Sequence, residues 1–191
     1  MQTWTDREAD GSELAMIQDA RAVAKRLGID YHVVDFRKEF KEHVMNYFVE
    51  EYLKGRTPNP CVVCNRFVKW EALLYYAEKV GADYIATGHY ARIDRLPNGR
   101  YAICNSVTAA KDQTYALYNL KQEQLAHTIM PVGAYTKDEI REFAQKLNLP
   151  VANKPDSQDI CFVPDGDYVR FLEEYTGKTY PAGEFVNSSG E

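Results

Sequence analysis

The sequence predicts an α/β protein, in which helices alternate with the strands of a parallel sheet. Twice along the chain a helical apolar pattern ends at a glycine, and a short strand-like run follows at residues 31–34 and again at 83–87. This alternation of helix and strand is typical of α/β folds. Thr87, Gly88 and His89 end the second run. In open parallel sheets this carboxyl edge is where ligands bind.

Local signals predict three helices and two strands in the first half of the chain. Helices are expected where apolar residues keep helical spacing, and a glycine just past the pattern ends the helix. The predicted helices span residues 12–27, 36–53 and 67–80, with Ser12 as the first cap and Gly28 and Gly81 as the stops. The two strand-like runs carry β-branched and aromatic residues, which favour strands.

The second half predicts a hairpin and more helices. Residues 91–104 form two short runs around an Asn98-Gly99 pair, a strong turn signal. Helical patterns cover residues 115–120 and 124–130. Another helix begins after Thr136, which forms a capping-box pattern with Glu139, and a last one follows a cap at Asp165 or Asp167.

Composition describes a globular protein with one sizeable core. The 191 residues are 45% hydrophobic and 27% charged, and neither a membrane span nor a signal sequence is evident, so we expect a cytoplasmic protein without a membrane partner. The formal charge of -5 argues weakly against nucleic acid. Basic residues nevertheless gather in two places: around residues 61–64, at Lys54, Arg56, Arg66 and Lys69, and near the middle of the chain, at Arg92, Arg95, Arg100 and Lys111.

Residues 57–70 (TPNPCVVCNRFVKW) carry the chemistry most clearly. Two prolines, Pro58 and Pro60, break any helix before Cys61 and Cys64, which are three positions apart just before a helical pattern begins at Phe67. A helix entrance favours thiolate, because unpaired N–H groups and the helix dipole stabilise negative charge there. The pattern indicates sulfur chemistry or a soft metal.

Other residues admit a functional and a structural interpretation. Gly88 would let a nucleotide approach the backbone closely, and His89 could contact a ligand or be a hydrogen-bonded strand-end histidine. Cys161 lies in a polar, turn-like stretch and is a second candidate thiol, whereas Cys104 is expected to pack as a small hydrophobe. Tyr75, Tyr76 and Tyr115 are interpreted as packing residues. Zinc is not expected, because no fourth ligand is evident.

Four strings resemble the tRNA-specific 2-thiouridylase family: residues 55–65 (GRTPNPCVVCN), 81–93 (GADYIATGHYARI), 111–117 (KDQTYAL) and 154–168 (KPDSQDICFVPDGDY). The resemblance implies a partial Rossmann-like parallel sheet of the adenine-nucleotide alpha hydrolase type, over residues 1–105. A mainly helical tRNA-binding region with the catalytic-cysteine loop would follow over 106–176, and the start of a C-terminal region over 177–191.

The family's activity, as the resemblance implies it, is ATP-dependent transfer of sulfur to C2 of the wobble uridine of tRNA, which makes it a sulfurtransferase. Cys161 would carry a persulfide received from a sulfur-relay protein or a cysteine desulfurase, and Cys64 would be the partner thiol. Gly88 would lie against ATP, which acts with Mg²⁺. The implied tRNA contacts, including the flipped base, are Asn59, Pro60, Cys61, His89, Lys111, Asp112 and Gln113.

The sequence departs from the family's pattern in two places. Many members carry an aspartate at the position of Cys61, and the family's phosphate loop and C-terminal barrel are not found here, so we expect a central fragment. Cys61, Cys64 and Cys161 would also fit a [4Fe-4S] cluster with one open iron, as in related tRNA thiolases. Cys61 is therefore open between cluster ligand, catalytic helper and spectator. The alternative function is an inactive tRNA-binding or iron–sulfur-binding fragment.

Overall fold

The structure is a computed structural model and describes residues 1–3, 12–154, 160–184 and 186–190. These residues belong to two units, 1–156 and 157–191. The α/β class is confirmed, because helices accompany parallel strand pairing in the first unit. Across the described ranges, no helix has both the length and the apolar character needed to cross a membrane.

Helix α1 (Ser12–Leu27) ends as predicted at Gly28, whose φ of 68° is in the left-handed region. The second predicted helix is a continuous run of three segments: α2 (Arg37–Phe40), a π-helical segment (Lys41–Met45) and α3 (Asn46–Leu53). It buries Phe40, Val44 and Phe48 almost completely. These apolar positions follow the spacing that predicted the helix.

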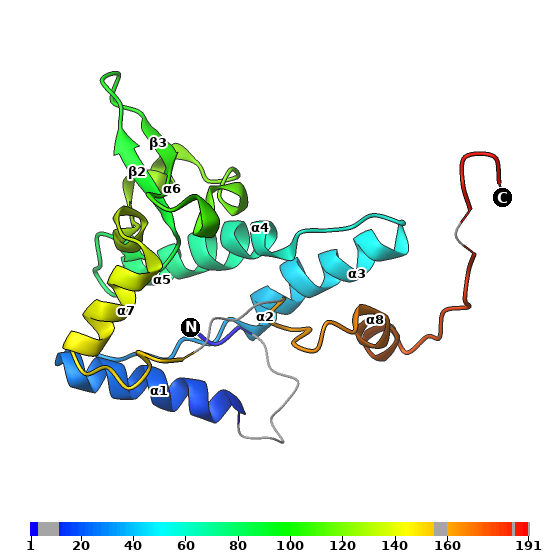
Figure 1. The fold of residues 1–191 in the computed structure, drawn as a ribbon, viewed down its shortest axis with the longest axis horizontal. Coiled ribbons are helices and arrows are strands. Elements are labelled where there is room, and N and C mark those ends of the chain that lie inside the picture. Colours follow the sequence, from blue (N-terminus) through cyan, green and yellow to red (C-terminus); the bar gives the residue numbers. More distant parts are fainter. Residues whose placement is uncertain (4–11, 155–159, 185, 191) are drawn as a thin grey trace. The chain divides into compact units, whose positions relative to one another are not determined.

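The third helical run begins earlier than the predicted residue 67. It consists of α4 (Pro60–Cys64), a π-helical segment (Asn65–Ala72) and α5 (Leu73–Lys79). Pro60 does not prevent this helix, because proline is tolerated at its first position, where no intrahelical N–H bond is lost. The run lies beside the α2–α3 run (Figure 1), and the rings of His43 and Phe67 stack between them at 4.7 Å.

The parallel sheet of the described residues is short. β1 (Ile85–Ala86) pairs in parallel with β4 (Thr128–Ile129). The strand predicted at 31–34 is not formed: only a parallel bridge joins Gln2 to Asp35, with a 2.8 Å bond from the Gln2 N–H to the Val34 carbonyl. A longer strand would need a partner along its whole length.

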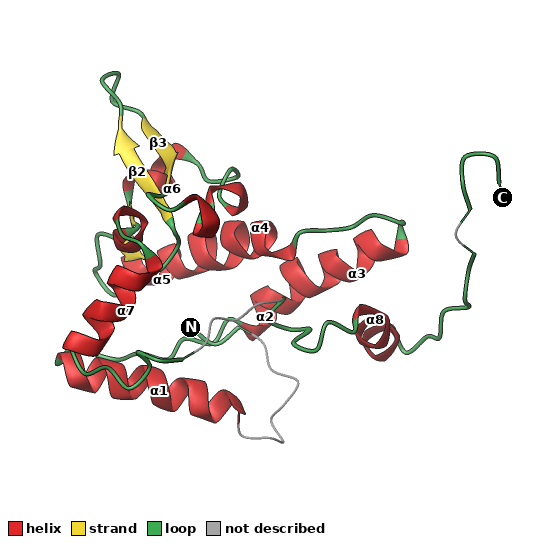
Figure 2. Cartoon of the chain, in the orientation of Figure 1, coloured by secondary structure: helices red, strands yellow, loops and turns green. Residues whose placement is uncertain are grey.

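The predicted hairpin is confirmed as β2 (Ala91–Arg95) and β3 (Tyr101–Asn105), an antiparallel pair (Figure 2). Gly99 takes a φ of 82° in its turn, as the Asn-Gly signal requires. Cys104 is half-buried in β3. A core cluster lies beneath the hairpin and includes Trp70, Ala91, Leu117 and Met130.

Of the two helices predicted at residues 115–120 and 124–130, the first is wrong and the second is confirmed only at its start. Residues 115–120 contain only a 3₁₀ turn (Thr114–Ala116), because the Asp112 side chain accepts bonds from Thr114 and organises a turn. The pattern at 124–130 gives α6 (Gln122–Ala126), which stops before β4. Pairing with β1 overrides the helical spacing there, and β-branched Thr128 suits a strand.

The remaining helices begin at their predicted caps. Two 3₁₀ segments (Ala109–Lys111 and Pro131–Ala134) lie before α7 (Lys137–Lys146), where Thr136 and Glu139 form the predicted capping box. In the second unit, Asp167 caps α8 (Tyr168–Thr176), and its side chain accepts from the Arg170 N–H. Phe162 is buried in this unit, with its ring 5.2 Å from that of Phe171.

Candidate active site

Cys61 and Cys64 lie in the first turns of α4, as the sequence predicts. Asn59 caps the helix, with its side-chain oxygen accepting from the Cys61 N–H at 3.1 Å, and Pro60 is buried at the first helical position. Cys61 is exposed and Cys64 is half-buried. Residues three apart in a helix share one flank. The two thiols therefore face the same way from a stiffened helix start.

Buried polar contacts hold this helix against the chain that follows β3. The amide of Asn65, next to Cys64, donates to the Ala116 carbonyl at 2.9 Å. The Trp70 indole N–H donates to the Thr128 hydroxyl at 2.7 Å, and Gln124 donates to the Trp70 carbonyl. Such buried bonds are costly to break, because each leaves an unsatisfied polar group. They fix the helix that presents the thiols.

Gly88 and His89 lie at the carboxyl edge of β1, as predicted. They line a pocket of about 350 Å³ together with Thr87, Lys69 and Gln113. A Cβ added at Gly88 would meet no atom within 4 Å, so the backbone there is open to a ligand. Lys69 comes from the helical run that carries the two cysteines. This pocket can hold a polar ligand against bare backbone.

His89 is held by a defined set of neighbours. It is 8% exposed, its Nδ1 lies 2.8 Å from the Thr87 hydroxyl, and its ring is 5.4 Å from that of Trp70. Burial, with a smaller effect from Lys69, lowers its pKa from 6.5 to about 4. The imidazole is therefore neutral at physiological pH and can donate or accept a hydrogen bond.

The predicted tRNA contacts Lys111, Asp112 and Gln113 occupy different environments. Lys111 is exposed. Burial acts to raise the pKa of Asp112, but hydrogen bonds from Thr114 and Ser106 outweigh it, and the pKa is lowered. Gln113 exchanges two bonds with the Tyr90 backbone, of 3.0 and 2.9 Å, and lines the Gly88 pocket. These bonds tie the segment to the sheet edge.

Cys161 belongs to the second unit. It is exposed and directly precedes the buried Phe162. Most of the string before it, residues 155–159, lies outside the described residues. The encounter of Cys161 with Cys64 stays a prediction.

Two of the predicted ligands of a metal or cluster, Cys61 and Cys64, lie close together in α4. Within the described ranges, no group of three His, Cys, Asp or Glu side chains is gathered in a way that could hold a metal ion. The third predicted ligand, Cys161, is in the other unit. The cluster therefore also stays a prediction.

Sequence reasoning missed several residues around these sites. Lys69 was not singled out as a neighbour of His89, since only the fold brings its helix beside the strand end. The packing interpretation of Tyr75 and Tyr115 is wrong, because these side chains are 60% and 61% exposed. Exposure of an aromatic residue has no signal in the local sequence.

Comparison with known proteins gives a consistent result. Residues 1–165 match the model of a family described as tRNA methyl transferase HUP domain. The chain is 59% identical over 197 residues to the tRNA-specific 2-thiouridylase MnmA of Lachnoclostridium phytofermentans. Its identity is 52% over 198 residues to the MnmA of Acetivibrio thermocellus, and 48% over 196 residues to that of Clostridioides difficile.

These alignments cover 100% of this chain but only 54% to 55% of each relative. The chain therefore spans about half the length of the curated relatives that it matches.

Proposed function

Since the chain belongs to the tRNA methyl transferase HUP domain family, with tRNA-specific 2-thiouridylases among its relatives, we propose that it forms the central part of a tRNA-uridine 2-sulfurtransferase. The reaction would replace the C2 oxygen of the wobble uridine with sulfur. The HUP domain, an adenine-nucleotide alpha hydrolase-like fold, accords with use of ATP.

In the proposed sulfur transfer, Cys161 carries a persulfide whose outer sulfur comes from a sulfur-relay protein or a cysteine desulfurase. The outer sulfur bonds to C2 of the uridine as the activated oxygen leaves. The Cys64 thiolate then attacks the inner sulfur, so the S–S bond breaks and C2 keeps the outer sulfur. A Cys64–Cys161 disulfide remains, and an external thiol reduces it.

The Gly88 pocket is the proposed place for ATP, which supplies the adenylyl group that makes the C2 oxygen a leaving group. Open backbone at Gly88 and the cation of Lys69 support this assignment. The neutral His89 beside them offers a hydrogen-bonding group without adding charge.

Asn59, Pro60 and Cys61 are proposed to contact the flipped base, and Lys111 the phosphate backbone. A uridine stacked in the anticodon cannot react at C2, so it must leave the stack and enter a pocket. The observation that carries the proposal is the position of the Cys61 and Cys64 thiols. They lie on one flank of a helix start, directly after the turn that Asn59 and Pro60 form.

The experiment is a turnover assay. The chain alone, and a form extended to the length of its relatives, receive ATP with Mg²⁺, a persulfide donor and substrate tRNA, and 2-thiouridine is measured by mass spectrometry. We expect product from the extended form only. Cys64→Ser and Cys161→Ser should abolish it, whereas Cys104→Ser, in the β3 strand, should not. An active Cys64→Ser or Cys161→Ser variant would overturn the assigned roles.

The cluster alternative is tested on the same preparations. Anaerobic iron and sulfide analysis with visible absorption detects a [4Fe-4S] cluster held by Cys61, Cys64 and Cys161. Iron in stoichiometric amount, lost together with activity in Cys61→Ser, would favour the cluster. A colourless, iron-free enzyme with full activity would exclude it.

A further inference from the structure

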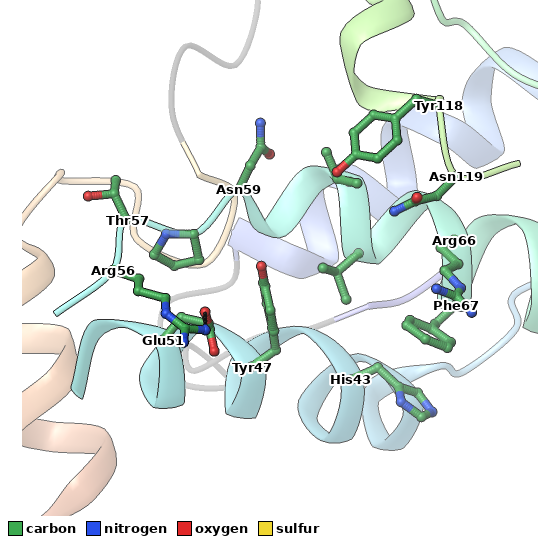
Figure 3. Close-up of a pocket in the computed structure, with 13 residues that line it drawn as sticks. His43, Tyr47, Glu51, Arg56, Thr57, Asn59, Arg66, Phe67, Tyr118 and Asn119 are labelled. Atoms are coloured by element: carbon green, nitrogen blue, oxygen red, sulfur yellow. Dashed lines mark hydrogen bonds and ion pairs between the residues drawn. The ribbon is translucent and has the colours of Figure 1, made fainter. Parts of the chain in front are cut away.

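A second pocket lies between the α2–α3 run and the α4 run (Figure 3). It borders a different flank of the α4 run from the one that carries Cys61 and Cys64. Its volume is about 460 Å³. One wall is the α2–α3 run, with His43 and Tyr47, and the other is the α4 run, with Val62 and Arg66. Tyr118 closes it from the segment after the Thr114–Ala116 turn (Figure 3). A pocket of this size can accept a small organic group.

The pocket is lined by aromatic rings suited to a flat ligand. His43 stacks on Phe67 with an interplanar angle of 16°, and Tyr47 projects from α3 toward the opposite wall (Figure 3). Tyr118 is 69% exposed although it is a large aromatic residue. Nucleobases stack on such rings, and single-stranded RNA is bound in this way.

One cation at the pocket, Arg66, suits a phosphate. Arg66 lies over the Phe67 ring at 4.7 Å, and its ion pair with Glu71 spans 3.9 Å, beyond hydrogen-bond distance. The Nε of Arg66 is buried without a hydrogen-bond partner. Arg56 pairs with Glu51 at 3.0 Å, and Lys54 pairs with both Glu51 and Glu50, at 3.1 and 3.8 Å, so these four side chains carry no net charge. Arginine and phosphate pair well in nucleic-acid recognition.

This pocket does not suit the reacting uridine itself. Val62, Val63, Arg66 and Phe67 line it, which is one flank of the helix, whereas neither Cys61 nor Cys64 contributes to the lining. C2 of the target base must reach a sulfur atom to react. A base in this pocket would instead lie on the flank of the α4 run that faces away from the two thiols. Asn59, the N-cap of α4, borders this pocket as well.

We propose that this pocket binds one nucleotide adjacent to the target uridine, with its base against Tyr118 and Tyr47 and its phosphate near Arg66. This inference rests on the proposed function and extends it. Splaying a neighbouring nucleotide to the opposite flank would hold the target base out of the anticodon stack on the cysteine flank. The pocket then contributes to selection of single-stranded RNA at this position.

Binding of an anticodon stem–loop RNA to the protein tests the proposal. Because Tyr118 is exposed, Tyr118→Ala should fold normally and weaken binding about tenfold, the typical effect of losing one base-stacking ring. Tyr75→Ala, at a similarly exposed position in α5, is the matched control and should bind as the parent does. Arg66→Gln should reduce the slope of log affinity against log salt by about one phosphate contact, whereas Arg141→Gln in α7 should not.

Stem–loops with an abasic site next to the target uridine identify the bound nucleotide. One of them should bind the parent protein about tenfold more weakly and show no further loss with Tyr118→Ala, because base and ring act as one pair. The pocket assignment would be overturned, while the proposed function stands, by either of two results. One is that the abasic site and Tyr118→Ala each weaken binding independently; the other is that Tyr118→Ala binds the RNA as well as Tyr75→Ala does. A parent protein without affinity for the stem–loop would overturn both.

Discussion

His89 shows how the fold tunes a single residue. Its ring lies between the Trp70 indole and the Thr87 hydroxyl, and little of it reaches solvent. A charged imidazole is unfavourable in such a place, so the proton is lost well below the ordinary pKa. The sequence left open whether this histidine is structural or functional. Its buried contacts and its place in the Gly88 pocket allow both roles.

The stability of the protein should depend on His89 in a defined pH window. Because the unfolded histidine binds a proton near pH 6.5 and the folded one near pH 4, the free energy of unfolding should fall as the pH drops through this range. The total loss attributable to His89 is roughly 3 kcal/mol. Urea unfolding at several pH values measures it, and His89→Gln should remove that part of the pH dependence.

Direct titration of the ring provides the check. The His89 imidazole signal in NMR should titrate near pH 4. A signal that titrates near pH 6.5, or a His89→Gln variant with an unchanged stability profile, would contradict the buried environment described above.

Elements with local signals were predictable, and elements that depend on distant partners were not. The cap of α7 at Thr136 and that of α8 at Asp167 involve residues within one helical turn, and both predictions are confirmed. The strand β4 depends on β1, far away in sequence, and the helical spacing of residues 124–130 concealed it. Likewise, Pro60 was interpreted as a helix breaker although its position makes it a helix start.

The contact between the 3₁₀ segment Pro131–Ala134 and β2 gives a prediction at this scale. A Cβ added at Gly133 would lie 1.8 Å from the Ala91 carbonyl oxygen, and this neighbour is backbone inside the hairpin. Gly133→Ala should therefore lower the free energy of unfolding by roughly 1–3 kcal/mol or more, as overpacking does. Urea unfolding measures the change.

Gly183→Ala is the control for this substitution, because a Cβ there meets no atom within 4 Å and its φ is not in the left-handed region. It should change stability by less than about 0.5 kcal/mol. Equal effects of the two substitutions would show that β2 can move away from Gly133 at little cost.

At the scale of the whole molecule, the candidate site is formed by segments that are far apart in the sequence. The sequence identified these segments but did not predict which of them lie together. The strings resembling the family identified Cys64, Gly88 and Gln113, and the fold gathers Gly88 with Gln113 in one pocket. The pocket at Tyr118 was not predicted, because its walls come from three separate segments and its aromatic residues show no motif. Tertiary packing alone creates it.

The central proposal is that the Cys64 thiolate attacks the inner sulfur of the Cys161 persulfide and forms a disulfide with Cys161. The direct test is a single turnover of the extended protein with ATP, tRNA and a persulfide donor, followed by non-reducing peptide mass spectrometry. Disulfide bonding requires Cα atoms about 4.4 to 6.8 Å apart, so the bond reports a close encounter. We predict one Cys64–Cys161 disulfide for each 2-thiouridine formed. Formation of 2-thiouridine without this disulfide would contradict the claim.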